Sequence, residues 1–441
     1  MMALKIAWPF MLTIMCVSMF HLKFDFVGFS FLILTIQSAT MLSISANGAA
    51  NLLTIYSIFS YTFFSIIPWI HYSDGVAIWR SAPLFPETYI FVNLAIFFAN
   101  ILTILAYFAT SGKRWYIEKR SFVVRRKQIT CLSLVGLASL GLFGVVHLSN
   151  YNVQLIVFRG IAGQIRDVVI ASSSAALVLG MATRLVPVFS FYFAVTEIKS
   201  ARLLKVTLFC IFLVSVFPTG VSRYMVAYTY IPLTMILFPR ARNGTLFSFG
   251  LLFALLIIFP FLDQFRNFSE SRNISLLPSK DFFLAGHFDA YENFASAVEV
   301  GFISNGFQLL GVLFFFVPRT LWPGKPVGSG YEMANNLNYS FDNISMPFLG
   351  EGYVNFGFIG IMVFAVFIGH IMARIDRSAV IQRRHNQHIS YRMTIYYFLF
   401  GGLFFLLRGD LLSSFAYLTA GFAIAWLVGE VMRLLNTRFR V

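Results

Sequence analysis

This sequence predicts an all-α, polytopic membrane protein. Three observations support the prediction: the composition, the hydropathy and the placement of the charged residues. Of the 441 residues, 58% are hydrophobic and 12% are charged, and 53 are Phe. A soluble protein carries about 25% charged residues, so this chain has too little polar surface to cover a water-facing particle. We therefore expect a fold that is solvated by lipid, and we exclude a disordered chain, a disulfide scaffold and a soluble enzyme.

Apolar runs account for the predicted helices. A helix needs about 20 apolar residues to cross a bilayer, so twelve spans would use roughly 240 residues. The first run follows Lys5 and has no small-residue cleavage pattern, so we expect a span rather than a cleaved signal peptide. We predict one membrane domain, 1–441, with about 12 transmembrane helices. The runs are 6–20, 28–45, 52–70, 89–109, 129–148, 180–196, 206–218, 224–238, 246–262, 353–373, 393–407 and 412–432.

The basic residues orient these spans. If alternate connections face the cytoplasm, that side holds 21 basic and 4 acidic residues, and the rest of the chain holds 12 basic and 14 acidic residues. Cytoplasmic loops are enriched in Lys and Arg, so we expect both termini in the cytoplasm. The formal net charge of +15 then reflects topology, and nucleic acid binding is excluded. The inner stretches are Lys5, 111–128, 197–205, 239–245, 374–392 and 433–441, together with Glu430 at the inner end of the last span.

Two longer and more polar segments face the opposite side. Segment 263–352 is too long for a bare connection in a compact protein, and we expect a large, partly helical loop over the outer helix ends. Within it, the run Leu309 to Val317 predicts a helix that dips partly into the lipid, or a re-entrant element. The stretch from Pro318 to Gly352 is rich in Pro, Gly, Asn and Ser, which indicates an ordered loop. Segment 149–179 is expected to form a smaller outer loop.

Several arginines fall on this outer side, where basic residues are normally depleted. Arg223 lies in a short turn between two predicted helices, and Arg408 begins another short turn that ends at Asp410. One alternative is that each guanidinium extends from a span end to the lipid headgroups. Guanidinium groups also bind phosphate with two hydrogen bonds, so a set of them at the outer leaflet suits a pyrophosphate-headed lipid. The set is Arg159, Arg166, Arg184, Arg223, Arg266, Arg272, Arg319 and Arg408.

A sugar hydroxyl that acts as an acceptor needs a base within hydrogen-bonding reach. Outer carboxylates or His287 could supply it, and Asp289 is the most suggestive because aromatic residues lie nearby. Most outer carboxylates are equally explained as solvated charges or as partners of the arginines. Spacing alone does not single out one base.

Metal chemistry has no signature in the sequence. Cys16, Cys131 and Cys210 are far apart and lie in or beside apolar runs, which is typical of small buried side chains. There is no Cys-x-x-Cys and no His-Glu-x-x-His pattern, so we expect neither a metal nor another cofactor.

Short motifs in the C-terminal half resemble those of the bacterial O-antigen polymerase family, also called oligosaccharide repeat unit polymerases. The turn Thr219 to Arg223 is similar to the family's Gly-Ser-Arg turn, with Val221 inserted between Gly and Ser. The resemblance covers residues from about 219 to 410, in a consistent order. Its other pieces are Gln308–Gly311, Phe316–Pro326, Phe288-Asp289, Gly350–Gly360 and Arg408-Gly409-Asp410.

The resemblance implies an inner-membrane enzyme of bacteria, similar in plan to membrane glycosyltransferases that use lipid-linked donors. Such an enzyme transfers a growing glycan from undecaprenyl pyrophosphate to the non-reducing end of a new lipid-linked repeat unit. The transfer takes place on the periplasmic face and uses no metal or nucleotide. The substrate is thus an undecaprenyl-pyrophosphate-linked oligosaccharide, and the resemblance leaves open a chain-length regulator protein as a partner.

This chemistry suggests a role for each candidate residue. The developing charge on the pyrophosphate needs preorganised cations, and we expect Arg223, Arg319 and Arg408 to act there with Asp289 as the base. Sugar rings would stack on aromatic side chains, although Trp322 and Tyr353 are equally explained as interface anchors. The residues expected to bind substrate are Arg159, Arg166, Arg266, His287, Tyr291, Trp322, Lys325, Glu351, Tyr353, Asn355 and Asp410, and further candidates are Tyr331, Asn335 and Asn343.

Three other functions are compatible with part of this pattern. An O-antigen ligase would share the outer arginines and the lipid-linked donor. A transporter of polysaccharide or lipid-linked oligosaccharide would need ionisable residues in mid-span, and the predicted spans are nearly free of charge. A structural membrane protein would leave the outer arginines unexplained.

Overall fold

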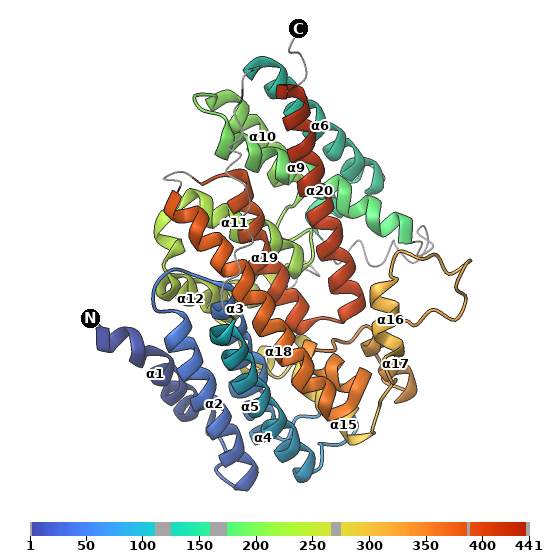
Figure 1. The fold of residues 1–441 in the computed structure, drawn as a ribbon. Helices are drawn as coiled ribbons and strands as arrows, with labels where there is room; N and C mark the ends of the chain where they lie inside the picture. The colour runs from blue at the N-terminus through green and yellow to red at the C-terminus, as the bar shows by residue number, and fades with distance from the viewer. Residues whose placement is uncertain are drawn as a thin grey trace.

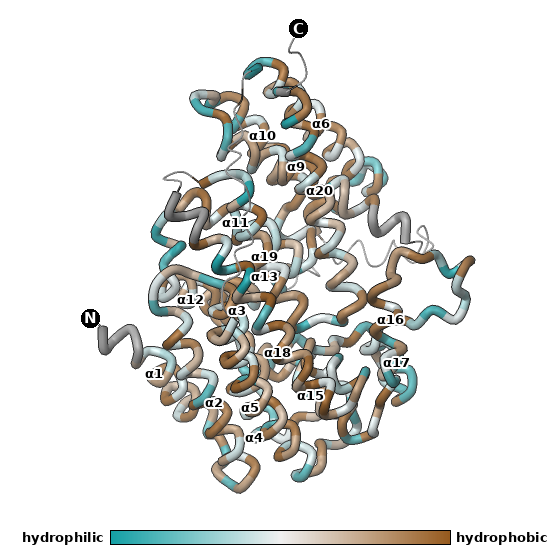
Figure 2. The backbone as a smooth tube through the Cα atoms, viewed as in Figure 1, coloured by the Kyte–Doolittle hydropathy of each residue, from teal (hydrophilic) through white to brown (hydrophobic). Residues whose placement is uncertain are grey.

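The computed structural model describes residues 2–110, 124, 126–158, 174–265, 275–385 and 389–437. This part of the chain is helical (Figure 1), and its only β-type pairing is an isolated bridge between Ala49 and Asn243. Hydrophobic residues line the helices, and hydrophilic residues gather mainly in the connections (Figure 2). The predicted all-α membrane fold is confirmed at this level.

Every predicted apolar run falls on a helix. Ten runs lie wholly inside a helical segment, and 206–218 and 224–238 extend slightly beyond helices that end at Ser215 and Leu237. The helical segments are α1 (Met2–Phe20), α2 (Phe26–Ser45), α3 (Leu52–Phe59) continuing through the π-helix η1 (Ser60–Ile66) into α4 (Ile67–Asp74), α5 (Pro86–Ala109), α6 (Lys127–Leu148), α9 (Ser174–Glu197), α10 (Arg202–Ser215), α11 (Arg223–Leu237), α12 (Gly244–Phe253) continuing through the π-helix η3 (Ala254–Ile258) into α13 (Phe259–Asp263), α18 (Phe348–His385), α19 (Tyr391–Arg408) and α20 (Leu411–Thr437).

Eight of these segments in the described part are long and apolar enough to cross a membrane. The apolar part of α1 is short, Ala7–Phe20. Helices α10 and α11 have 14 and 15 residues, and α19 carries Arg392 and Arg408 within its 18 residues. The structure therefore shows a helical membrane protein with eight candidate spans, and the count of twelve stays a prediction.

Polar side chains start several of these helices, because the first N–H groups of a helix have no partner within it and lipid offers none. Asp25 Oδ1 accepts from Gly28 N at 2.8 Å and begins α2. Asn51 Oδ1 accepts from Thr54 N at 2.9 Å and begins α3. Asp376 of α18 accepts from Leu52 N at 3.0 Å, so the start of α3 is also tied to a distant helix.

Two hydrophobic cores organise the bundle. One is built around α2, the α3–η1–α4 segment, α5 and α18, and includes α15 (Ala290–Glu299). The other is built around α6, α9, α10 and the later part of α20. Helix α19 contributes to both cores and packs against α11. The space between the cores therefore lies beside α11 and α19.

The connection between α13 and α18 runs over 264–347, close to the predicted boundaries 263–352. Its described part, from residue 275, is partly helical, as predicted. Helix α15 packs into the first core, with Tyr291 and Phe294 fully buried. The periplasmic location of this segment, and of 149–179, stays a prediction. The two connections and the turn before α12 contain further short helices. These are α7 (Val153–Val157), η2 (Pro239–Arg242), α14 (Lys280–Phe283), η4 (Gly286–Phe288), α16 (Phe307–Leu313) and α17 (Ser329–Asn336).

The close packing of α5 on α18 leads to a first prediction. A Cβ at Gly369 of α18 would lie 2.4 Å from the carbonyl oxygen of Thr103 in α5. Gly369→Val should therefore force the two helices apart and cost roughly 1–3 kcal/mol of stability, seen as a lower melting temperature in detergent. Gly136→Val in α6 is the matched control, because a Cβ there meets no described atom within 4 Å. Equal melting of the two variants would contradict the proposed packing constraint.

Candidate functional site

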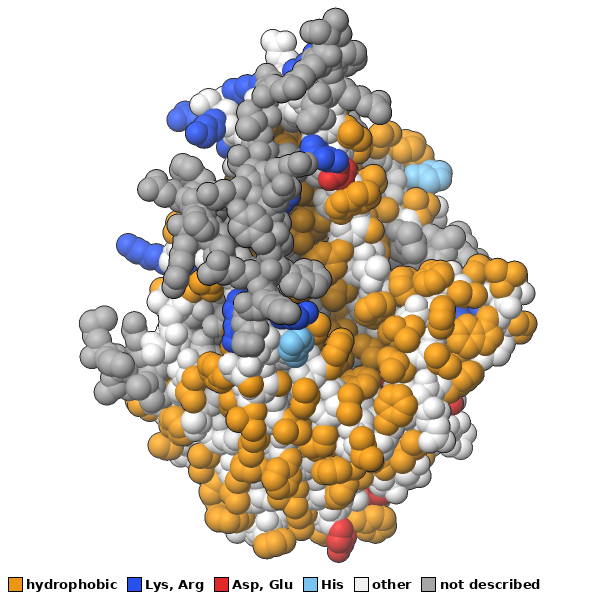
Figure 3. All heavy atoms as spheres, viewed as in Figure 1, with side chains coloured by type: hydrophobic (Ala, Val, Ile, Leu, Met, Phe, Trp, Pro, Cys, Tyr) orange, Lys and Arg blue, Asp and Glu red, His pale blue; other side chains and the backbone are white. Residues whose placement is uncertain are grey.

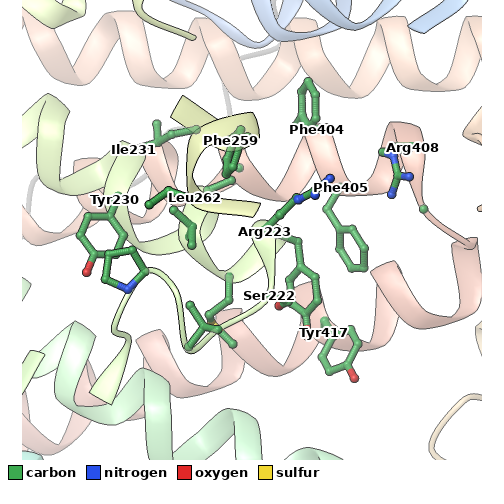
Figure 4. A pocket seen from close by; sticks show the side chains of 18 of the residues that line it. Ser222, Arg223, Tyr230, Ile231, Phe259, Leu262, Phe404, Phe405, Arg408 and Tyr417 are labelled. Atoms are coloured by element: carbon green, nitrogen blue, oxygen red, sulfur yellow. The ribbon is translucent and has the colours of Figure 1, made fainter. Parts of the chain in front are cut away.

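A cavity of about 1340 Å³ lies between the two cores. Its walls are mostly apolar, because α12 and the following π-helix turn Phe247, Leu251 and Leu255 toward it. Its polar end contains Arg223 at the start of α11 and Arg408 at the end of α19. Figure 4 shows both arginine side chains among the residues that line the cavity. The cavity is therefore amphipathic, with apolar walls along the helices and cations at one end.

Arg223 is part of a cluster of three ionisable side chains from three elements. Its Nη2 atom donates to Oδ1 of Asp263, the last residue of α13, at 2.5 Å. Nε2 of His287 lies 3.2 Å from Oδ2 of the same carboxylate and 3.4 Å from Nη2 of Arg223. The imidazole is one-quarter exposed, and within the described ranges its Nδ1 atom has no hydrogen-bond partner. With Nε2 protonated toward Asp263, Nδ1 would be a free acceptor at the cavity.

Arg408 binds the same short segment from the other side. Its Nε atom donates to the carbonyl oxygen of His287 at 3.2 Å, and Nη2 donates to Oδ1 of Asp289 at 3.0 Å. Segment 287–289 thus lies between two guanidinium groups that are far apart in the sequence. Each guanidinium has a carboxylate partner, which lowers the cost of keeping a charge beside mostly apolar walls.

Asp289 is buried and already surrounded by donors. Oδ1 accepts from Ser345 Oγ at 2.7 Å as well as from Arg408. Oδ2 accepts from Trp79 Nε1 at 3.1 Å and from Asn293 Nδ2 at 3.0 Å. This arrangement favours a role in positioning Arg408. The assignment of Asp289 as the base stays a prediction, and His287 has the more accessible acceptor atom.

Trp79 is a cavity residue that the sequence did not reveal. It lies in the connection between α4 and α5, 210 residues before Asp289, and no spacing links the two. Its φ of +64° is rare for a bulky side chain, and such backbone strain often accompanies functional sites. The indole stacks on Phe341 with ring centroids 5.0 Å apart, and a Cβ at Gly286 would lie 2.2 Å from its Cζ2 atom. Trp79 therefore fixes the segment that carries His287 and Asp289.

The connection that carries Trp79 is held by Glu299 of α15. Its carboxylate forms an ion pair with Arg80 and accepts from Phe85 N at 3.0 Å. Burial disfavours ionisation of Glu299, but the hydrogen bonds from Arg80 and Phe85 outweigh it and lower the pKa. Charge on Glu299 thus helps to fix the loop beside the cavity.

Glu351 and Asp410 hold helix termini at the edge of the cavity. Glu351 accepts from Leu411 N at 2.9 Å and from Ser329 Oγ at 2.7 Å. Asp410 accepts from Ser413 N at 3.2 Å and from Gly330 N at 3.3 Å, and it lines the cavity. Burial raises the pKa of Asp410. These two predicted substrate-binding carboxylates thus cap α20 and join it to α17.

The remaining predicted site residues lie elsewhere. Tyr291 is in the first core and donates to Asn93 Oδ1 at 2.8 Å. Tyr353 and Asn355 lie in α18, and Asn355 Oδ1 accepts from Leu309 N at 2.7 Å. These three side chains do not line the cavity described above, and the same holds for Arg319, Trp322 and Lys325. Arg159, Arg166 and Arg266 fall outside the described residues. The roles predicted for all of them stay predictions.

Other features of the cavity bear on its ligand. Arg184 of α9 and His147 of α6 also line it, as does Asn343. In the part of the chain that the structure describes, no group of three or more His, Cys, Asp or Glu side chains could hold a metal ion.

Comparisons with protein-family models, curated proteins and solved structures find no match to this chain.

The pKa of Glu299 leads to a second prediction. Because its folded-state pKa is below 4.5, its contribution to stability is present above that pH and is lost as the pH falls through the lowered value. Glu299→Gln should therefore destabilise the protein by roughly 1–2 kcal/mol at pH 7, and the difference from wild type should shrink in acid. Melting curves from pH 7 to pH 3 would measure this. Glu87→Gln, an exposed site in the first turn of α5, is the control. A difference that does not change with pH would contradict the assignment.

Proposed function

We propose that this chain is a glycosyltransferase of the O-antigen polymerase type. It would transfer a growing glycan from undecaprenyl pyrophosphate to the non-reducing end of a new lipid-linked repeat unit. The observation that supports this best is the amphipathic cavity, in which Arg223 and Arg408 lie at the end of an apolar space. A lipid with a pyrophosphate headgroup combines the same two properties, an apolar chain and a compact double anion.

The paired arginines suit the leaving group. As the bond between the anomeric carbon and the pyrophosphate oxygen breaks, negative charge grows on that oxygen. Preorganised cations at this position stabilise the transition state more than the ground state. Asp263 and Asp289 hold the two guanidinium groups in place, so little reorganisation is required during the reaction.

His287 is the base that we favour. Its Nδ1 atom would accept the proton of the acceptor hydroxyl as that oxygen attacks the anomeric carbon. Nε2–H would donate to Asp263, whose charge stabilises the imidazolium that forms. The new glycosidic bond replaces the bond to pyrophosphate, and undecaprenyl pyrophosphate leaves. Asp289 is the second candidate base.

The proposed topology has twelve spans in the bacterial inner membrane, both termini in the cytoplasm, and segments 149–179 and 263–352 in the periplasm. It is supported by the excess of basic residues on the predicted inner side. Under this topology, the polar end of the cavity faces the periplasm.

Cysteine labelling tests the topology. Ser340→Cys, in the exposed part of the connection after α17, should react with a membrane-impermeant maleimide in intact spheroplasts. Lys199→Cys, in the exposed turn that follows α9, should react only after the membrane is opened. Both changes are made in a chain whose three native cysteines are replaced by serine. Labelling of residue 199 but not 340 in intact cells would overturn the proposed orientation and the periplasmic site.

Polymerisation in vitro tests the chemistry. Arg223→Ala, Arg408→Ala and His287→Ala should each lower the rate at least 100-fold, because each removes a charge or a proton acceptor from the reaction centre. The assay uses purified protein, a defined lipid-pyrophosphate repeat unit and a chelator. Arg202→Ala, at an exposed position at the start of α10, is the control and should retain activity.

The same variants separate polymerase from ligase in cells. Loss of a polymerase leaves single-repeat lipid intermediates, whereas loss of a ligase leaves full-length polymer on the carrier lipid. Wild-type polymer from the Arg223 and Arg408 variants would refute the roles assigned to these residues.

A further inference from the structure

Helix α16 and the loop that follows it, residues 307–326, form a projection that we call the α16 spur. In Figure 1 the chain after α16 extends away from the helical body at the right of the view. The spur exposes large apolar side chains, including Phe316 at 68% and Leu321 at 78% of their surface. Figure 3 shows hydrophobic side chains covering this edge of the molecule. The other exposed apolar residues of the spur are Phe307, Leu310, Leu313 and Phe314.

The basic side chains of the spur bond to its own backbone, although Arg319 itself is exposed. The Lys325 ammonium donates to the carbonyl oxygens of Phe315 at 2.5 Å and Val317 at 3.0 Å, and the residue is only 8% exposed. Arg319 donates to the carbonyl oxygens of Lys325 at 2.6 Å and Pro326 at 3.2 Å. Burial, together with the nearby Arg319 charge, lowers the pKa of Lys325. The spur therefore presents apolar side chains outward and uses its charges to satisfy its own backbone.

This arrangement is unfavourable for a loop in water. A lysine ammonium on a hydrated surface is normally solvated, and peptide carbonyls there bond to water. The hydrocarbon region of a bilayer holds no water, so each backbone carbonyl there needs a donor from the protein. Cations that bond to the carbonyl groups of the loop, and phenylalanine and leucine side chains that point outward, suit that environment.

We propose that the α16 spur inserts into the lipid bilayer beside the spanning helices and anchors the connection between α13 and α18. Lipid is the occupant that the surroundings favour, because α16 packs against α20 and α18, two candidate spans. Both helices carry exposed apolar side chains, such as Trp426 on α20 and Ile359 on α18. The apolar surface of the spur adds to the surface that these helices turn to lipid. The inference does not depend on the proposed glycosyltransferase activity.

An inserted spur would also stabilise the position of the residues around Asp289. The chain that leaves it forms α17 and then reaches Ser345, whose hydroxyl donates to Asp289. Arg319 and Lys325 would then hold the backbone of the inserted spur in place through their hydrogen bonds.

Spin-label accessibility tests the insertion. The full chain, with Cys16, Cys131 and Cys210 replaced by serine, carries one label at Phe316→Cys or Leu321→Cys and is reconstituted into phosphatidylethanolamine–phosphatidylglycerol vesicles. Labels in lipid collide with oxygen more than with the water-soluble complex Ni(II)-EDDA. We expect an oxygen-to-nickel ratio several-fold higher at residues 316 and 321 than at Ser340→Cys, an exposed position after α17. Equal ratios would overturn the proposal, and shielding from both reagents would show that protein rather than lipid covers the spur.

Removing the inward-turned charge provides a second test. Lys325→Met leaves two carbonyl groups without their donor, and we expect the label at residue 316 to become several-fold more accessible to nickel as the spur leaves the lipid. Lys199→Met, at an exposed position, should leave that label unchanged. No effect of Lys325→Met would show that the ammonium is not needed for insertion and would contradict the argument from backbone satisfaction.

The unmodified protein gives a measurement that does not depend on any variant. A lipid-soluble carbene reagent, photolysed in the same vesicles, should modify residues 313–321 about as strongly as the exposed face of α20. It should spare the exposed residues of α17. An unmodified spur in a folded protein would overturn the inference.

Discussion

The site depends on two ion pairs, each between an arginine and an aspartate, that meet at segment 287–289. In a cavity with apolar walls, an unpaired guanidinium or carboxylate would carry a large desolvation cost. Arg223 pairs with Asp263, and Arg408 pairs with Asp289. These two ion pairs bring the start of α11, the end of α13, the end of α19 and segment 287–289 to one place. The cavity is the space between the two hydrophobic cores, and the ion pairs determine which side chains lie at its polar end.

Further contacts make this arrangement rigid. Trp79 holds Asp289 through its N–H group, and Glu299 holds the loop that carries Trp79. Trp79 comes from a connection that is neither helical nor rich in motifs, and Glu299 is the last residue of α15. Their contribution is indirect, since they fix the donors and acceptors that the cavity presents. A site of this kind relies on its supporting contacts as much as on its charged residues.

The chain contains two kinds of basic residue that look alike in the sequence. Arg223 and Arg408 point to the cavity and pair with carboxylates, whereas Arg319 and Lys325 bond to carbonyl groups of their own loop. The difference follows from the environment of each side chain. A guanidinium beside the cavity can serve a ligand, and one that satisfies backbone carbonyls in a projecting apolar loop serves the loop.

The sequence alone determined the helices, because lipid offers no hydrogen-bond partners and a backbone in lipid must satisfy its bonds within each segment. A local apolar run is then enough to predict a helix, and all twelve runs fall on helices. It also identified Arg223 and Arg408 as candidates through their type and their place near helix ends, His287 through its type, and Asp289 through its aromatic neighbours. Tertiary structure decided which of them meet, because the paired residues are separated by 40 to 210 positions and no local pattern encodes such contacts. It also placed Trp79 beside the cavity and Arg319 in the spur, since the direction of a side chain depends on how its loop packs and not on its neighbours in the chain.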